Sequence, residues 1–170
     1  MDFGLTIDQG DRKINEGSCC LGHISRVTLF AMSNKSAKIA ALIDGCRGQE
    51  LDAHYIGYFE CFNRGLFYES HEVLEELWLA DRNGPNGAFY KSLIQLAGAF
   101  VHLQKNRLRP AAALFKLAQE NLQKYPATHE RLNVTQVLSI IKRWLEQLEV
   151  GDFSGNPLID ASAPRLNLLS

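Results

Sequence analysis

The sequence carries no excess of either charge and no long apolar run. Its 170 residues include 18 Lys and Arg against 19 Asp and Glu, so the net charge is −1. Nucleic-acid binders need clustered cations to neutralise phosphates, so we expect no nucleic-acid partner. No apolar run reaches the roughly 20 residues that a helix needs to span a bilayer, so we expect no membrane partner. Asp2, Asp8 and Asp11 stand where a secretory signal would carry positive charge, which favours a cytoplasmic location.

Cysteine is scarce, and its spacing fits no metal site. Cys19 and Cys20 are adjacent, which is not a normal zinc-ligand spacing, and Cys46 and Cys61 stand alone in the sequence. We interpret all four as reduced thiols, the buried ones packing as small hydrophobic residues. The sequence also lacks the glycine-rich loops of nucleotide-binding proteins and the Gly-x-Ser-x-Gly turn of many hydrolases. It therefore indicates no cofactor.

The two ends of the chain differ from its middle. Residues 1–31 mix glycine with polar residues and show no sustained hydrophobic period, whereas Met32 stands just before a good helix-capping stretch. We interpret 1–31 as a disordered or wrongly included leader. Residues 150–170 hold glycine, serine, asparagine and two prolines, which predicts an irregular tail. The predicted domain is therefore 32–149.

Between residues 36 and 149, apolar residues recur at the spacing of amphipathic helices, with no strand-like alternation. Asp52 can cap the second helix and Gly65 can end it, while Asn133 can cap the sixth. Residues 88–104 are apolar nearly all round, which is typical of a central, buried helix. We predict an all-α bundle of about six helices arranged as antiparallel hairpins. The predicted helices cover about residues 36–46, 53–64, 67–79, 88–104, 110–125 and 134–150, the fifth opening at Pro110.

The third predicted helix carries the densest polar cluster, an HExxE sequence that begins at His71. His71, Glu75 and Trp78 share one stripe of this helix, because residues three and four positions apart lie on the same face. Glu72 lies on the next stripe. Buried carboxylates and imidazoles must be paired, so we expect partners for them on a neighbouring helix.

The fourth predicted helix offers candidate partners. Gln95 and His102 are the strongly polar residues in its apolar run, and they share a face with Gly98 and Ala99 between them. The two small residues leave room for a side chain, a water or a small ligand to approach the helix. Antiparallel packing can bring this face opposite the polar cluster of the third helix.

Three hypotheses remain open for these residues. In the first, Glu72 or Glu75 holds Gln95 or His102 in a buried hydrogen-bond network that fixes the register of the bundle. In the second, the residues line a pocket for a small polar or anionic ligand, with Trp78 and Tyr58 as apolar walls. In the third, they form a metal-assisted or His/Glu-dependent hydrolase. The predicted ligand-binding set is His71, Glu72, Glu75, Trp78, Gln95 and His102.

The sequence does not complete either of the two metal-binding motifs that it partly resembles, those of the zincins and of the ferritin-like proteins. The HExxE sequence is the zincin helix motif with its second histidine replaced by Glu75, and no third ligand is evident. Ferritin-like sites need a glutamate three residues before each histidine, but Tyr68 and Ala99 stand at those positions. We therefore predict no metal site.

We predict a small ligand-binding or scaffold module. The hydrolase remains one alternative. A homo-oligomeric interaction module, using the aromatic residues Tyr55, Tyr58 and Phe59, is the other.

The order of these motifs resembles a known family. The turn Phe62-Asn63-Arg64-Gly65 comes first, then Glu69-Ser70-His71-Glu72 with Glu75 and Trp78, and finally Leu93-Ile94-Gln95-Leu96-Ala97 with His102. This order resembles the bacterial and archaeal domain of unknown function 309 family over about residues 52–149. Ser70 stands where relatives usually show alanine. The resemblance implies a compact all-α domain and no established activity, so the three hypotheses stay open.

Overall fold

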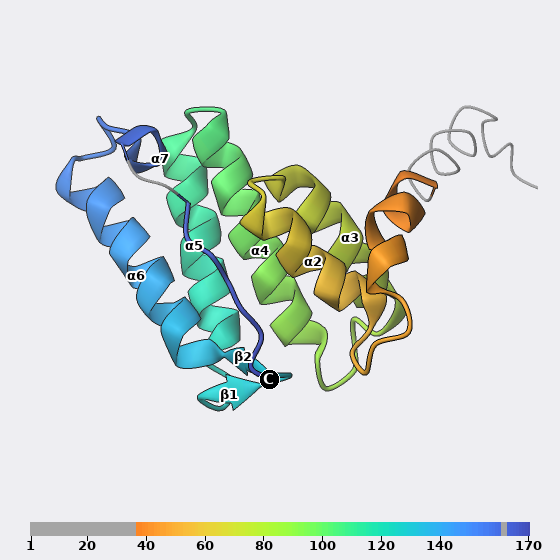
Figure 1. The fold of residues 1–170 in the computed structure, drawn as a ribbon. Helices are drawn as coiled ribbons and strands as arrows, with labels where there is room; N and C mark the ends of the chain where they lie inside the picture. Colours follow the sequence, from red (N-terminus) through yellow and green to blue (C-terminus); the bar gives the residue numbers. More distant parts are fainter. Residues whose placement is uncertain (1–36, 161–162) are drawn as a thin grey trace, which may run out of the picture.

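The computed structural model describes residues 37–160 and 163–170 and confirms the predicted all-α bundle (Figure 1). Residues 37–43 are helical and lead into the 3-10 helix η1 (Asp44–Cys46). The longer helices are α2 (Ala53–Asn63), α3 (Phe67–Ala80), α4 (Gly87–Gln104), α5 (Leu108–Leu122) and α6 (Val134–Val150), followed by the short α7 (Pro157–Asp160). Two short strands that the sequence did not indicate, β1 (Thr128–His129) and β2 (Leu132–Asn133), pair antiparallel before α6.

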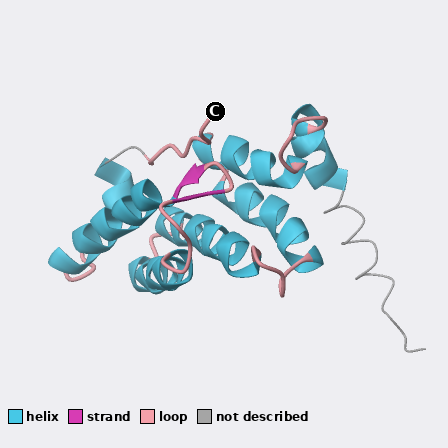
Figure 2. Ribbon diagram, turned by 90° about the horizontal axis from the view of Figure 1, so that it is seen from below, coloured by secondary structure: helices cyan, strands magenta, loops and turns pink. Residues whose placement is uncertain are grey.

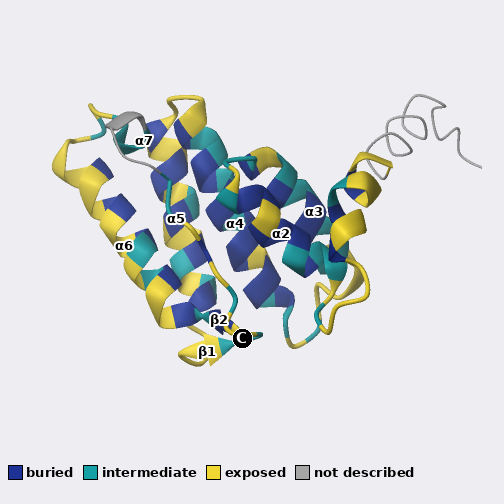
Figure 3. Cartoon of the chain, in the orientation of Figure 1, coloured by how far each residue is buried: buried dark blue, intermediate teal, exposed yellow. Residues whose placement is uncertain are grey.

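Each long helix packs mainly against its neighbours in sequence: α2 on α3, α3 on α4, α4 on α5 and α5 on α6. The central position predicted for residues 88–104 is confirmed, because buried residues lie on most sides of α4 (Figure 3). Phe100 of α4 reaches both flanks of the bundle, with ring centroids 5.4 Å from Phe62 of α2 and 5.0 Å from Trp144 of α6. These edge-to-face contacts join the outer helices through one core.

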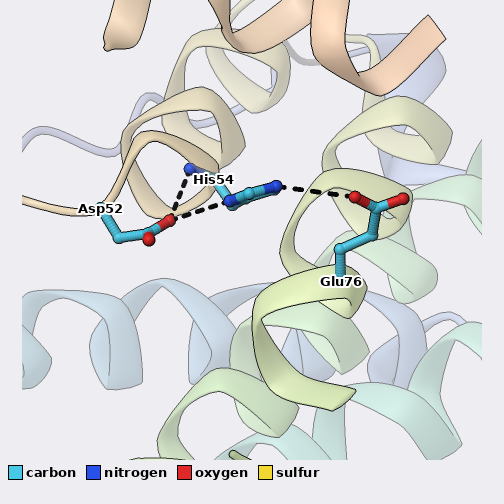
Figure 4. A network of polar contacts seen from close by, with 3 residues as sticks. All are labelled: Asp52, His54 and Glu76. Carbon is cyan, nitrogen blue, oxygen red and sulfur yellow. Dashed lines mark hydrogen bonds and ion pairs between the residues drawn. The ribbon is translucent and has the colours of Figure 1, made fainter. Parts of the chain in front are cut away.

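Polar side chains cap the starts of α2 and α6. The carboxylate of Asp52 accepts a hydrogen bond from the backbone N–H of His54 at 2.8 Å, which confirms the predicted cap of α2. The His54 ring lies 3.0 Å from the same carboxylate through Nδ1 and 3.6 Å from Glu76 of α3 through Nε2, so it links the two helices (Figure 4). The side chain of Asn133 accepts from the N–H of Gln136 at 2.9 Å, as predicted for α6.

The start of the fifth helix was predicted wrongly. Helix α5 begins at Leu108, so Pro110 is its third residue and not its first. Proline is still compatible with that place, because the first four N–H groups of a helix have no partner within the helix.

The buried cysteines agree with their interpretation as thiols. Cys46 and Cys61 are free and buried, and burial raises the pKa of Cys61 to about 11. Cys19 and Cys20 lie outside the described residues, as does the predicted leader. Among the described residues, no helix is both long enough and apolar enough to cross a membrane.

The last residues of the chain, 163–170, lie extended across the helices as a C-terminal strap. In Figure 1 this strap runs from α7 between α6 and α2 to the two short strands, and Figure 2 shows its end beside them. Leu166 is buried, and its backbone makes two hydrogen bonds of 2.8 Å with the side-chain amide of Asn63. Further along, Leu168 bridges to Leu132, and the N–H of Leu169 donates to the carbonyl of Arg131 at 2.7 Å. The strap therefore connects α2 to the strands that precede α6.

Candidate functional site

A cavity of about 250 Å³ opens between α3, α4 and α5, and we call it the first cavity. Helix α4 supplies most of its lining, α3 contributes two aromatic side chains and α5 one aliphatic side chain. The lining residues are Tyr68, His71, Ile94, Gln95, Gly98, Val101, His102, Lys105 and Leu114. Three of the six residues predicted to bind a ligand are thus brought together here: His71, Gln95 and His102.

The polar side of the first cavity comes from the periodicity of α4. Gln95, Gly98, His102 and Lys105 follow one another at steps of three, four and three residues, which places them along one face of the helix. Lys105 is the C-cap residue of α4 and adds a cation to this face. The same spacing is present in the sequence, but Lys105 is not among the predicted site residues.

Gly98 keeps the middle of the first cavity open. A Cβ atom at this position would lie 3.1 Å from Cδ1 of Leu114, closer than a comfortable van der Waals contact. A larger side chain would therefore fill the space between α4 and α5. This agrees with the expectation that small residues leave room beside Gln95 and His102.

The partner of Gln95 comes from α5, which carries none of the predicted site residues. The side-chain N–H of Asn121 donates to Oε1 of Gln95 at 3.0 Å, and Oδ1 of Asn121 accepts from Lys124 at 2.9 Å. Because Oε1 of Gln95 is the acceptor in this bond, its NH₂ group is the part left to donate.

His102 is partly buried and lies near two positively charged side chains. Burial lowers the pKa of His102 from the ordinary 6.5, and the nearby cations Arg107 and Lys105 lower it further. The imidazole is therefore neutral at pH 7, with one nitrogen that donates and one that accepts. Also in the lining, the half-exposed Tyr68 ring lies nearly parallel to the His71 ring, with 6.5 Å between the ring centroids.

The other predicted site residues lie elsewhere. Trp78 lines a second cavity near the start of α4. Glu72 and Glu75 are half-buried on α3 and are not among the residues lining the first or the second cavity. Tyr58, expected as an apolar wall, lies fully in the core and donates to the carbonyl of Leu93 at 2.9 Å.

Two observations bear on the interaction-module alternative and on the metal-assisted form of the hydrolase alternative. Tyr55, Tyr58 and Phe59 are at most 4% exposed, so they cannot form the aromatic contact surface that an interaction module would need. Within residues 37–160 and 163–170, no three His, Cys, Asp or Glu side chains are grouped closely enough to hold a metal ion.

Comparison with known proteins finds similarity over the part of the chain that lines the first cavity. Residues 55–114 match the family model "Domain of unknown function (DUF309)". This match confirms the resemblance carried by the sequence motifs, and it includes every residue that lines the first cavity.

One curated relative is an uncharacterized protein of Aquifex aeolicus (strain VF5), 26% identical over 91 residues. That similarity covers 54% of this chain and 27% of the relative, so the chain spans only about a quarter of the length of the relative it matches. No solved structure matches the chain significantly.

Proposed function

We propose that this protein is a binding module for a small organic anion with an apolar body, held in the first cavity. The composition of the lining carries this proposal: four hydrogen-bonding side chains and one lysine surround an aliphatic floor, and no Asp or Glu is among the nine residues. Ligand pockets combine mainly apolar walls with a few convergent polar groups. The volume of about 250 Å³ suits a ligand smaller than a typical drug molecule.

Each part of the lining has a distinct role in this proposal. Lys105 supplies the charge that a carboxylate would meet, and the NH₂ group of Gln95 and the neutral His102 supply hydrogen bonds. The aliphatic side chains of Ile94, Val101 and Leu114 then take the apolar body.

The cavity also bears on the hypothesis of a buried network. In that hypothesis Glu72 or Glu75 holds Gln95 or His102. The hydrogen bond to Oε1 of Gln95 comes instead from Asn121, and Gln95 and His102 line the first cavity, whose lining includes neither glutamate. These observations favour a ligand over a purely structural role.

Isothermal titration with hexanoate, hexan-1-ol and hexylamine tests the proposal. We expect hexanoate to bind saturably and the alcohol and amine to bind at least about tenfold more weakly, since a charge-assisted hydrogen bond contributes about 1.5–3 kcal/mol. Lys105→Ala should weaken hexanoate binding by a similar factor. Gly98→Leu should abolish it, because the new side chain fills the space beside Leu114.

Lys116→Ala is the matched control. Lys116 is an exposed lysine of α5 that pairs with Glu149 at 2.8 Å and does not line the first cavity. The Lys116→Ala variant should bind hexanoate as tightly as the unmodified protein does. Equal affinities for hexanoate and hexan-1-ol, or binding indifferent to Lys105→Ala and Gly98→Leu in folded variants, would refute the proposal.

A further inference from the structure

A second cavity of about 370 Å³ lies at the N-terminal end of α4, whereas the first cavity borders the C-terminal part of this helix. Its lining comes from the end of α3 and the following turn, the start of α4 and the end of α5. The lining residues are Trp78, Arg82, Asn83, Gly87, Ala88, Lys91 and Asn121. No residue lines both cavities, although Asn121 of the second is hydrogen-bonded to Gln95 of the first.

The chemistry of the second cavity is that of an anion site. Two cations, Arg82 and Lys91, and two side-chain amides, Asn83 and Asn121, converge on it, and its lining contains no Asp or Glu. Neither cation forms an ion pair with another residue in the part of the chain that the structure describes. Both charges therefore remain available to a ligand.

A close backbone contact holds Arg82 in this place. Gly87 packs so tightly on the preceding turn that a Cβ atom at this position would clash with the carbonyl oxygen of Arg82. The turn thus folds back over the start of α4. This contact brings Arg82 and Asn83 to the same cavity as Lys91, one turn further along the helix.

Trp78 gives the second cavity a flat apolar wall. Its half-buried indole is the one aromatic side chain in the lining, next to the small Gly87 and Ala88. An indole face suits a planar ring, whereas guanidinium and ammonium groups suit a phosphate.

We infer that the second cavity binds an aromatic phosphate, with the ring on Trp78 and the phosphate between Arg82 and Lys91. This site is separate from the proposed organic-anion site and does not depend on it. It assigns a role to Trp78 different from the one expected from the sequence, since Trp78 lies with Arg82 and Lys91 and apart from His71 and His102.

Phenyl phosphate and inorganic phosphate are the probes that test this inference. In a ¹H–¹⁵N correlation spectrum, the indole signals of Trp78 and Trp144 are assigned with a Trp144→Phe variant. Phenyl phosphate should shift the Trp78 signal saturably and leave that of Trp144, which is 2% exposed, unchanged. Inorganic phosphate should bind at least about fivefold more weakly, because it lacks the ring that contacts Trp78.

Substitutions distinguish phosphate binding in the second cavity from nonspecific electrostatic attraction to the protein surface. Arg82→Ala and Lys91→Ala should each weaken phenyl phosphate binding about tenfold. Lys142→Ala, an exposed lysine on α6, should leave it unchanged. No saturable shift, or an equal loss with Lys142→Ala, would overturn the site, and equal affinity for the two phosphates would overturn the role of Trp78. Gly98→Leu should not affect this binding, so failure of the first cavity and failure of the second are distinguishable.

Discussion

The two hydrogen bonds between Asn63 and the backbone of Leu166 give the sharpest test of the fold. The Asn63 side chain donates to the carbonyl and accepts from the N–H of the same residue, as a neighbouring strand would. In Asn63→Ala both bonds are lost, and both backbone groups of Leu166 lose their partner. Each bond contributes about 0.5–1.5 kcal/mol net, so we expect the variant to lose about 2 kcal/mol of unfolding free energy.

This loss should be visible in thermal and urea unfolding. For a chain of this size, about 2 kcal/mol corresponds to a fall in Tm of about 4–8 °C. Asn167→Ala is the matched control, because Asn167 lies one residue further along the same strap and is exposed. It should change the unfolding free energy by no more than about 0.5 kcal/mol.

A double-mutant cycle tests the physical reason. Leu166→Ala alone should cost about 2–4 kcal/mol, because the side chain is 3% exposed and its removal leaves a cavity. Since both residues act by holding the strap in place, the double variant should lose less than the sum of the single losses. The reasoning is refuted if Asn63→Ala is as stable as Asn167→Ala, or if the two losses are fully additive.

Two further predictions concern the pocket and the helix packing. Burial and Arg107 lower the pKa of His102 in the folded protein, so the folded state takes up a proton on this residue only below pH 6.5, where the unfolded state does. The free energy of unfolding should therefore fall as the pH drops below about 6.5. His102→Gln should flatten this dependence in urea unfolding between pH 5 and 7.5; an unchanged slope would contradict it. Gly57→Ala should destabilise the protein by about 1–3 kcal/mol despite the better helix propensity of alanine, since its Cβ would lie 2.7 Å from the side chain of Ile43. Gly45→Ala, with no atom within 4 Å of the new Cβ, should show no such loss in the same melting assay.

The helices were predictable because their signals are local. Asp52 and Asn133 cap the following helices through atoms two and three residues away, and Gly65 ends α2 with φ +74°, a conformation open to glycine. The start of α5 was missed because proline is tolerated at several positions in the first turn, so Pro110 does not mark one of them.

The candidate site was predictable only where its polar residues interrupt the apolar pattern of a helix. Gln95 and His102 stood out because they are polar residues in an apolar helix. The contribution of α5 was not predictable, because Asn121 is one polar residue among many on an amphipathic helix and its contact with Gln95 spans 26 positions. The hydrogen bonds that hold the C-terminal strap were not predictable for the same reason, since Asn63 and Leu166 lie 103 positions apart and their bonds follow no sequence period.

The strap also changes how the molecule should unfold. Helices that pack mainly on their sequence neighbours approach a one-dimensional array, which can fray inward from either end. The strap crosses this array and bonds to Asn63 near one end and to the strands beside α6 near the other. Fraying at either end must then break the same contacts. The consequence is cooperativity: amide protons of α2 and α6 should exchange through a shared opening event, which the sequence order of the helices alone would not require.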